Sequence, residues 1–495
     1  MKQFKKITFI FCLSVAGIAA KAQKVTLTKG QQSSVELVKS SEVINFTANG
    51  DNYYFTKFYE HAVMNYHLLC YDSKGSYIAK TNVEINLGTF NNTYSIDDVV
   101  SLGDKAYAMV EHLDKAAGKN TLLARVIDNK GKVSETETEV MSIPFEKIMN
   151  SGFNNSASSP DMKTLAVIGE MPFVKEQPAT FKVAIYDASL KKTGEGQINL
   201  PGENTKNKSM SVAVGNDGTV YIIKKGMTKK GEITLAVYQW SAAKPADVKE
   251  YIIEVTEPMQ ISGYTCTVND NSEIVVSGLY YERKTLTVGE KQAVGVLYFT
   301  NKGKTENLFK TFALDAKVDN LTAEKVLVNG NTIFLTAENY KEERITPPAS
   351  TAGTAASFDY NYDYTHKSDF VIAMDADGNK KFQLELSKDG KARDLDKQLY
   401  SAYYICNGKL TVVYNDDIKK YMKDYYSNGY TGLIPVLVQI TNDGLMQSPV
   451  IFKDDLRIDR DYMLYPAFST QQATNQLSFL ESNGQYFKFL GVKVD

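Results

Sequence analysis

The feature that most constrains this sequence is an internal repeat. Seven times, a polar turn-forming cluster leads into a short apolar segment, and successive clusters start about 53 to 60 residues apart until one interval near 77. The seven segments are ANGDNYYFTKF (48–58), LGDKAYAMVEH (102–112), SPDMKTLAVIG (159–169), GNDGTVYIIKK (215–225), NDNSEIVVSGL (269–279), NGNTIFLTAE (329–338) and CNGKLTVVYN (406–415). A period of this length indicates a chain built from one supersecondary unit used many times.

A second segment follows each of these in the same register. It is an apolar strand that runs into a turn rich in Asp, Asn and Gly, as in FVIAMDADG (370–378) and VLVQITNDG (436–444). These residue types supply the backbone conformations that join antiparallel strands. A strand of alternating polarity, such as VKEYIIEV (248–255), then ends the unit. Each unit therefore predicts four antiparallel strands, which we call a, b, c and d in chain order.

Seven units are complete, and an eighth lacks its last strand. YMLYPAFST, NQLSFLESNG and QYFKFLGVKVD supply a, b and c at the end of the sequence, whereas KVTLTK (24–29) is a spare strand near its start. A strand from the start of the chain that completes the last unit would close a ring and remove two open sheet edges. The repeat resembles the β-propeller architecture, without the WD dipeptides or Kelch glycine pairs that mark named propeller families.

We therefore predict an all-β protein with a single β-propeller domain over 23–495, of eight four-stranded blades closed by the N-terminal strand. One alternative is a propeller of seven blades with an extra hairpin. Another is a pair of stacked β-sandwiches, which would explain neither the even period nor the missing strand. Long helical patterns are absent, which argues against an α/β fold.

The start of the sequence has the composition of a targeting signal. MKQFKK is basic, ITFIFCLSVAGIAA is apolar, and AKA at Ala20–Ala22 fits a signal-peptidase site. We expect 1–22 to be a signal peptide and the mature chain to be exported, to the periplasm, the outer membrane or the extracellular space. No later run of about 18 apolar residues follows, so we expect no transmembrane segment in the mature chain.

Cysteines and charge exclude two further classes. Cys70, Cys266 and Cys406 are an odd and sparse set, so we expect small buried apolar residues and not a disulfide framework. The formal net charge of −2 gives no basic surface for nucleic acid, which we exclude as a partner.

Three long b–c connections fall on consecutive blades, at 280–292, 340–369 and 415–435. Loops of this length are usually functional or disordered. In an antiparallel blade all b–c connections lie on one face of the disc, so we expect these insertions to form one ridge. In the third insertion, Ile418, Tyr421, Met422 and Tyr425 recur at helical spacing and predict a short amphipathic helix.

The blade 6 insertion ends in SFDYNYDYTHKSDF (357–370), where aromatic and polar residues alternate. We interpret it as a hairpin arm, with one row of rings toward the blade 7 insertion and another toward solvent or a partner. Tyr and Arg are enriched at the centres of protein interfaces. The predicted partner-binding residues are Tyr340, Arg344, Phe358, Tyr360, Tyr362, Tyr364, Tyr421, Tyr425, Tyr426 and Tyr430. The alternative is that these tyrosines pack against their own domain.

Signals for chemistry are weak. His61, His67, His112 and His366 lack metal-ligand spacing, and no nucleophile elbow or phosphate-binding loop is present, so we predict no catalytic residue, metal site or cofactor. DADGNKKFQLEL (375–386) begins like a calcium loop but lacks its Gly and final Glu, and we interpret it as a c–d hairpin.

The functional hypothesis is an exported, non-enzymatic propeller that acts as a protein-binding or scaffold subunit, with an outer-membrane protein complex as a candidate partner. A first alternative is a carbohydrate-active or other hydrolytic propeller that uses loop carboxylates, so enzymatic activity and carbohydrate binding stay open. The carboxylates in question are Asp359, Asp363, Asp369, Asp416 and Asp417. A second alternative is a small-ligand or metal-ion sensor module.

Overall fold

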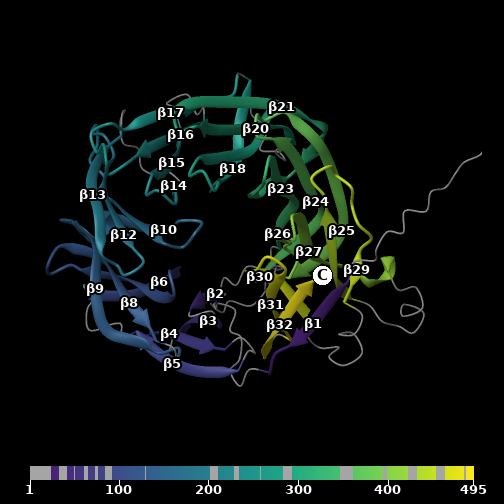
Figure 1. Cartoon of the computed structure of the whole chain (residues 1–495), viewed down its shortest axis with the longest axis horizontal. Coiled ribbons are helices and arrows are strands. Elements are labelled where there is room, and N and C mark those ends of the chain that lie inside the picture. The colour runs from purple at the N-terminus through teal and green to yellow at the C-terminus, as the bar shows by residue number, and fades with distance from the viewer. Residues whose placement is uncertain are drawn as a thin grey trace, which may run out of the picture.

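The computed structural model describes 24–32, 42–48, 51–60, 65–72, 76–83, 92–128, 130–200, 210–227, 233–256, 258–282, 292–345, 361–393, 398–421, 432–452, 463–483 and 486–495. These residues form eight four-stranded antiparallel sheets arranged in a ring (Figure 1). In blades 3 to 5 the first strand, such as β10 or β14, lies toward the ring axis and the last, such as β13 or β17, lies at the rim (Figure 1). The chain is therefore an eight-bladed β-propeller, as the repeat predicts.

The strands follow the chain order within each blade. Blade 1 contains β2 (Glu42–Ala48), β3 (Asp51–Glu60), β4 (Asn65–Tyr71) and β5 (Tyr77–Val83), and blade 2 contains β6 (Asn92–Leu102), β7 (Lys105–Asp114), β8 (Lys119–Ile127) and β9 (Val133–Pro144). Blade 3 contains β10 (Phe153–Ser158), β11 (Thr164–Glu170), β12 (Thr180–Asp187) and β13 (Lys192–Asn199), and blade 4 contains β14 (Met210–Val214), β15 (Val220–Met227), β16 (Ile233–Trp240) and β17 (Lys249–Ile253).

The second half of the ring repeats this order. Blade 5 contains β18 (Met259–Val268), β19 (Ile274–Glu282), β20 (Gln292–Lys302) and β21 (Glu306–Asp319), and blade 6 contains β22 (Leu321–Asn329), β23 (Thr332–Ile345), β24 (Asn361–Asp375) and β25 (Lys380–Arg393). Blade 7 contains β26 (Ala402–Cys406), β27 (Lys409–Asp417), β28 (Leu433–Ile440) and β29 (Val450–Ile451), and blade 8 contains β30 (Met463–Ala473), β31 (Gln476–Ser482), β32 (Phe487–Val494) and β1 (Val25–Lys29). Two 3-10 turns, η1 (Ile148–Asn150) and η2 (Ile418–Lys420), are the other regular elements of the described residues.

Blade 8 is built from both ends of the sequence. β1 pairs with β32 in antiparallel register from Val25↔Val494 to Lys29↔Leu490. The backbone N–H of Asp495 donates to the carbonyl of Lys24 at 3.0 Å. The predicted closure of the ring by the N-terminal strand is therefore confirmed, and the seven-blade and sandwich alternatives are wrong.

The apolar core lies between the blades. In the described residues the buried apolar side chains form eight clusters, one at each contact between neighbouring blades. At the contact of blades 8 and 1, Leu69 and Tyr71 of β4 pack with Leu480, Phe487 and Phe489. Burying a side chain of this size contributes about 1.5–3 kcal/mol. Each blade therefore buries its apolar side chains against the blades on both sides of it.

The c–d turns explain the recurring Asp-x-x-Gly pattern. In blade 6 the Asp375 carboxylate accepts the backbone N–H of Asp377 at 3.0 Å and of Asn379 at 2.8 Å. Gly378 has φ +75°, and a Cβ there would lie 2.5 Å from the ring of Tyr298 in blade 5. The predicted c–d hairpin is confirmed, and its glycine meets both the turn conformation and the approach of the neighbouring blade.

Two sequence expectations concern export and cysteine. The predicted signal peptide, 1–22, lies outside the described residues. No helix among the described residues is long and apolar enough to cross a membrane. Cys70 and Cys406 are buried thiols, whereas Cys266 is half-buried, and none of the three forms a disulfide.

The turn glycines give a first test. Gly378→Ala is expected to lower the free energy of unfolding by about 2–4 kcal/mol, because it adds a clash with Tyr298 to the cost of a positive φ. Gly330 is the control: its φ is +58° and a Cβ there meets open space, so Gly330→Ala should cost only the conformational part, about 1–2 kcal/mol. Urea unfolding measures both, and equal losses would contradict the packing role of Gly378.

Candidate functional site

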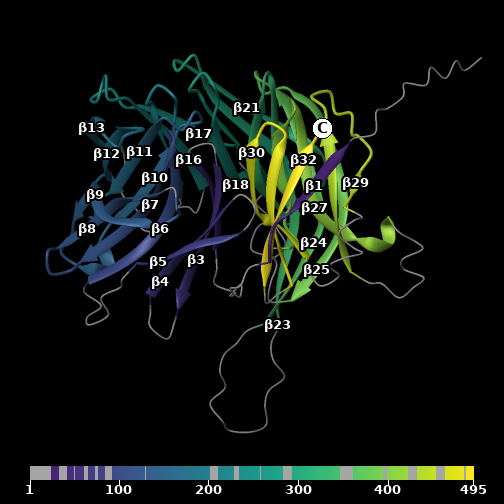
Figure 2. The same ribbon diagram turned by 60° about the horizontal axis from the view of Figure 1, so that its bottom comes forward.

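In blade 6, the two middle strands, β23 and β24, extend beyond the end of the first strand, β22. β23 and β24 pair from Thr332↔Asp375 as far as Ile345↔Asn361. β22 pairs with β23 only as far as Leu321↔Asn339, and β25 accompanies β24 to Asp363↔Arg393. We call the ribbon beyond Asn339 the arm: Tyr340–Ile345 of β23 with the paired ends of β24 and β25. Figure 2 shows this end of β23 pointing away from the lower edge of the disc.

Much of the predicted blade 6 insertion is thus regular strand. Residues 346–360 lie outside the described residues, and with them the predicted contact residues Phe358 and Tyr360. The same holds for 283–291 of blade 5 and 422–431 of blade 7, including Tyr425, Tyr426 and Tyr430. A continuous ridge over blades 5 to 7 stays a prediction.

The described tyrosines of the arm share one face. Tyr362 and Tyr364 stack at 6.2 Å between ring centroids, and Tyr364 stacks on Tyr340 of the neighbouring strand, also at 6.2 Å. Tyr400, just before blade 7, stacks on Tyr340 at 6.2 Å. The expectation of two rows of rings is wrong here, because side chains two residues apart in a strand point to the same side. The row faces the start of blade 7. We call these four rings the tyrosine face.

Two other predicted contact residues are described. Arg344 is exposed on the arm opposite Tyr362. Tyr421 follows η2, packs against the core between blades 6 and 7, and donates its hydroxyl to Oδ2 of Asp416 at 2.7 Å. Burial raises the pKa of Tyr421 far above its usual value. Only the 3-10 turn of the predicted blade 7 helix falls within the described residues, and Tyr421 lies half-buried beside it.

At the base of the arm lies a group of buried ionisable side chains, which we call the charged cluster: Glu338, His366, Asp369 and Lys388. None is more than 1% exposed. Glu338 and Asp369 stand directly opposite each other on β23 and β24, a pairing of like charges that is destabilising by itself. Nζ of Lys388 lies 2.7 Å from Oδ1 of Asp369 and 3.4 Å from Oε2 of Glu338, so its ammonium balances both carboxylates.

The charged cluster also joins blade 6 to blade 7. The backbone N–H of Ser401 donates to Oε1 of Glu338 at 2.7 Å, and the Ser401 hydroxyl donates to Oδ2 of Asp369 at 2.6 Å. The Tyr403 hydroxyl donates to Oε1 of Glu338 at 3.2 Å. His366 presents Nδ1 to Oε2 of Glu338 at 2.8 Å, while its buried Nε2 has no hydrogen-bond partner within the described part of the chain. The arm base is therefore fixed to the next blade.

Burial and charge act in opposite directions on the members of the charged cluster. Burial raises the pKa of Asp369 and outweighs the attraction of Lys388. Burial also acts against the ionised form of Glu338, but the Lys388 ammonium and the His366 hydrogen bond outweigh it and lower the pKa of Glu338. Desolvation opposes the charge of Lys388, yet the carboxylates of Asp369 and Glu338 hold its pKa above the usual value. Lys388 is thus the ion on which the charged cluster depends.

Of the five carboxylates in the hydrolytic alternative, Asp369 and Asp416 are buried, Asp363 and Asp417 are half-buried, and Asp359 lies outside the described residues. Asp369 belongs to the charged cluster, and Asp416 is also fully buried. The Asp416 carboxylate accepts the N–H of Asp389 at 3.0 Å and of Asp417 at 2.8 Å, and pairs with Lys420 at 3.0 Å. Both carboxylates are thus occupied by structural contacts. Among the described residues, no group of three or more His, Cys, Asp and Glu side chains is placed to hold a metal ion.

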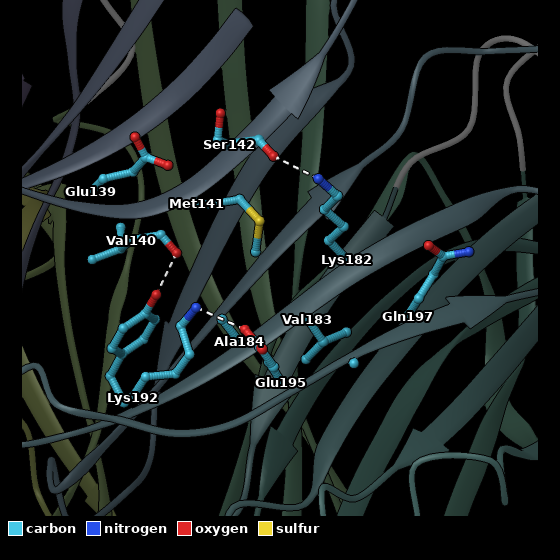
Figure 3. Close-up of a pocket in the computed structure, with 12 residues that line it drawn as sticks. Glu139, Val140, Met141, Ser142, Lys182, Val183, Ala184, Lys192, Glu195 and Gln197 are labelled. Carbon is cyan, nitrogen blue, oxygen red and sulfur yellow. Dashed lines mark hydrogen bonds and ion pairs between the residues drawn. The ribbon is translucent and has the colours of Figure 1, made fainter.

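A groove of about 450 Å³ lies between blades 2 and 3, lined by residues of β9, β12 and β13 (Figure 3). Met141, Val183 and Ala184 supply its apolar lining. Its lysines are engaged by neighbours: Lys182 donates to the Ser142 carbonyl at 3.1 Å, and Lys192 pairs with Glu195 at 2.8 Å. The groove is open, and both of its lysines already hold neighbouring groups, so it offers less chemistry than the arm.

Comparison with known proteins finds only distant structural likenesses. No protein-family model matches the sequence, and no curated protein matches it. Among solved structures, the WD40 domain of SCAP from fission yeast is similar at 8% identity and a TM-score of 0.40, over 95% of this chain and 94% of that one. Polysaccharide lyase Uly1 is similar at 10% identity and a TM-score of 0.43, over 94% of this chain and 99% of that one. The α-L-arabinanase of Penicillium chrysogenum complexed with arabinobiose is similar at 10% identity and a TM-score of 0.33. The match covers 58% of this chain and 98% of that one.

The charged cluster gives a second test. Lys388→Met is expected to destabilise the protein by about 3–5 kcal/mol at pH 7, because two buried carboxylates lose their counter-ion. The loss should shrink as the pH falls, since without the ammonium both carboxyl groups take up protons more readily. The double variant Lys388→Met/Asp369→Asn should recover more than half of the loss. Urea unfolding at pH 7 and pH 5 measures this, and a pH-independent loss would contradict the electrostatic account.

Proposed function

We propose that this chain is an exported scaffold propeller that binds a partner protein through the arm of blade 6. The single observation that supports it most is the extension of β23 and β24 as a paired ribbon past the end of β22. A ribbon that leaves its sheet adds little to the shared cores of the ring but exposes charged residues to a partner. Glu342, Glu343 and Arg344 on β23 are all exposed.

The base of the arm favours a binding role, because it is held in one orientation before any partner arrives. Tyr340 of the arm stacks on Tyr400, and the charged cluster accepts hydrogen bonds from Ser401 and Tyr403 of the blade 7 segment. Fixing a binding element in advance reduces the conformational entropy lost on association. The exported location rests on the predicted signal peptide, and an outer-membrane complex as the partner belongs to the same proposal.

The hydrolytic alternative has less support from the site. Its candidate carboxylates Asp369 and Asp416 are fully buried and carry structural contacts, so a substrate would have to displace those contacts to meet them. Glu338 and His366 form a carboxylate–imidazole pair of the kind used in general-base catalysis. Both are buried, and the rings of Tyr340 and Tyr400 pack against His366. Carbohydrate binding by the tyrosine face would be tested by the same variants as protein binding.

Shortening the arm tests the proposed function. Residues 344–362 would be replaced by Asn-Gly in the tagged mature chain, so that the native pair Glu343↔Asp363 flanks the turn and the charged cluster stays in place. The wild-type chain is purified from the envelope of the source organism and is expected to retain a partner protein. The amount of this partner that co-purifies with the shortened chain should be at least tenfold lower. Mass spectrometry identifies the partner, and titration of the two purified proteins gives the affinity.

The matched control replaces the blade 4 b–c loop, 228–232, by Asn-Gly. This variant should bind the partner as the wild type does, and both variants should unfold near the wild-type temperature. If the shortened arm binds the purified partner with unchanged affinity, the arm is not the binding element.

A further inference from the structure

The two carboxyl groups of the charged cluster differ in the hydrogen bonds that they make. The Glu338 carboxylate accepts from the backbone N–H of Ser401 at 2.7 Å and from the Tyr403 hydroxyl at 3.2 Å. It also faces Nδ1 of His366 at 2.8 Å. An ionised carboxylate only accepts hydrogen bonds, whereas a protonated one must donate one. With donors on both of its oxygens, Glu338 is held in its ionised form.

Asp369 has partners that suit both of its protonation states. Its Oδ2 lies 2.6 Å from the hydroxyl oxygen of Ser401, and its Oδ1 lies 2.7 Å from Nζ of Lys388. A hydroxyl group either donates or accepts a hydrogen bond. The Ser401 hydroxyl therefore donates to Asp369 when Asp369 is ionised, and accepts from it when Oδ2 carries a proton. Oδ1 stays beside the Lys388 ammonium in both states, so Asp369 can take up a proton without leaving either oxygen unpaired.

His366 is the other candidate for the same proton, and its contacts suit the proton less well. Because the ionised Glu338 carboxylate only accepts, Nδ1 of His366 already carries the hydrogen between them. A second proton would have to go to Nε2, which is buried and has no hydrogen-bond partner in the described part of the chain. A buried N–H without an acceptor costs free energy. The hydrogen bonds therefore favour Asp369 as the site of proton uptake.

The charge balance of the cluster acts in the same direction. Among the described residues, Lys388 is the one lysine or arginine within ion-pair distance of Glu338 or Asp369. Two carboxylates and one ammonium leave one buried negative charge while His366 is neutral, and one proton removes it. The other ionisable groups around Asp369 come from neighbouring strands: Tyr403 of β26 and Tyr414 of β27, with Glu324 and the Lys420-paired Asp416 beyond these two tyrosines. None of these groups adds an uncompensated positive charge.

We propose that Asp369 is a pH-sensitive element at the base of the arm, which takes up a proton in mildly acidic solution and thereby holds the arm more firmly to blade 7. This inference rests on the proposed function and adds its regulation. Burial raises the pKa of Asp369, so the closed arm base binds the proton more tightly than an opened base in water. The resulting stabilisation is complete below the ordinary pKa of an aspartate and is lost as the pH rises through the raised value.

Hydrogen exchange in the full mature chain tests the proposal without a partner. The readout is the protection factor of the backbone amides that pair β23 with β24 beyond Asn339, which corrects for the pH dependence of exchange itself. In the wild type, protection should be about fivefold higher at pH 5.5 than at pH 8. Asp369→Asn resembles the protonated carboxyl group in shape and hydrogen bonding, so its protection should be equal at the two pH values. Equal protection in the wild type overturns the proposal, and so does a pH dependence that Asp369→Asn retains.

A variant of His366 and an infrared measurement identify the group that takes up the proton. His366→Asn keeps an N–H group for Glu338 and removes the imidazole, so it should keep the pH dependence of the wild type. If His366→Asn abolishes that dependence, the proton goes to His366 and the proposal is wrong. The infrared difference between pH 5.5 and pH 8 should contain a protonated-carboxyl band that Asp369→Asn lacks. Identical bands in the two proteins would also overturn the proposal.

The purified partner distinguishes this failure from failure of the proposed function. The affinity of the wild type should decrease more between pH 5.5 and pH 8 than that of Asp369→Asn, because both proteins share every other titrating group. If the two affinities change equally while the shortened arm loses the partner, only the regulation is wrong. If the shortened arm retains the partner, the proposed function is wrong, whatever hydrogen exchange shows at the arm base.

Discussion

The structure depends on the fact that its hydrophobic cores lie between blades and not inside them. Each four-stranded sheet is too thin to bury its own apolar side chains, so Leu69 of β4 or Phe487 of β32 finds its neighbours across a blade boundary. Eight such contacts close on themselves only when the last blade is complete. β1 contributes to that completion, because its Val25 and Leu27 pack against the core between blades 7 and 8.

Blade 6 contains residues that do not contribute to closing the ring. Its β23 and β24 continue past β22, and the charged cluster sits where they leave the sheet. A buried set of two carboxylates, one ammonium and one imidazole is a costly way to join two blades, since apolar side chains of the same volume often serve as well. What it provides is direction: Ser401 and Tyr403 donate hydrogen bonds to the Glu338 carboxylate, and these bonds orient the base of the arm.

The repeat was enough to predict the ring, because its signals are local. An Asp and a Gly three residues apart at the end of an apolar strand favour a turn, and one spare strand of alternating polarity indicates how the ring closes. The charged cluster was beyond such reasoning. Glu338 is one charged residue in the apolar strand TIFLTAE, and Lys388 lies fifty residues further on, where the pairing of β24 and β25 is interrupted between Ser387 and Gly390. Only the register of three strands brings the two together.

The tyrosines show the same limit from another side. The alternation in 357–370 correctly indicated a strand over its described part, 361–370, and the period of two should have placed its rings on one face. What the sequence did not contain was the position of Tyr400, which approaches Tyr340 through the return of the chain to the next blade. Contacts between blades are set by the packing of whole sheets, and no local pattern encodes them.

The closure of blade 8 has a mechanical consequence. Lys24 and Asp495 are hydrogen-bonded neighbours at the same end of an antiparallel pair. A force that separates the two chain ends therefore loads the β1–β32 bonds one after another, in peeling geometry, and not all together in shear. The ring would open at its seam under a small load, before any other blade boundary carries tension. A tether at Lys24 or Asp495 thus pulls directly on this seam.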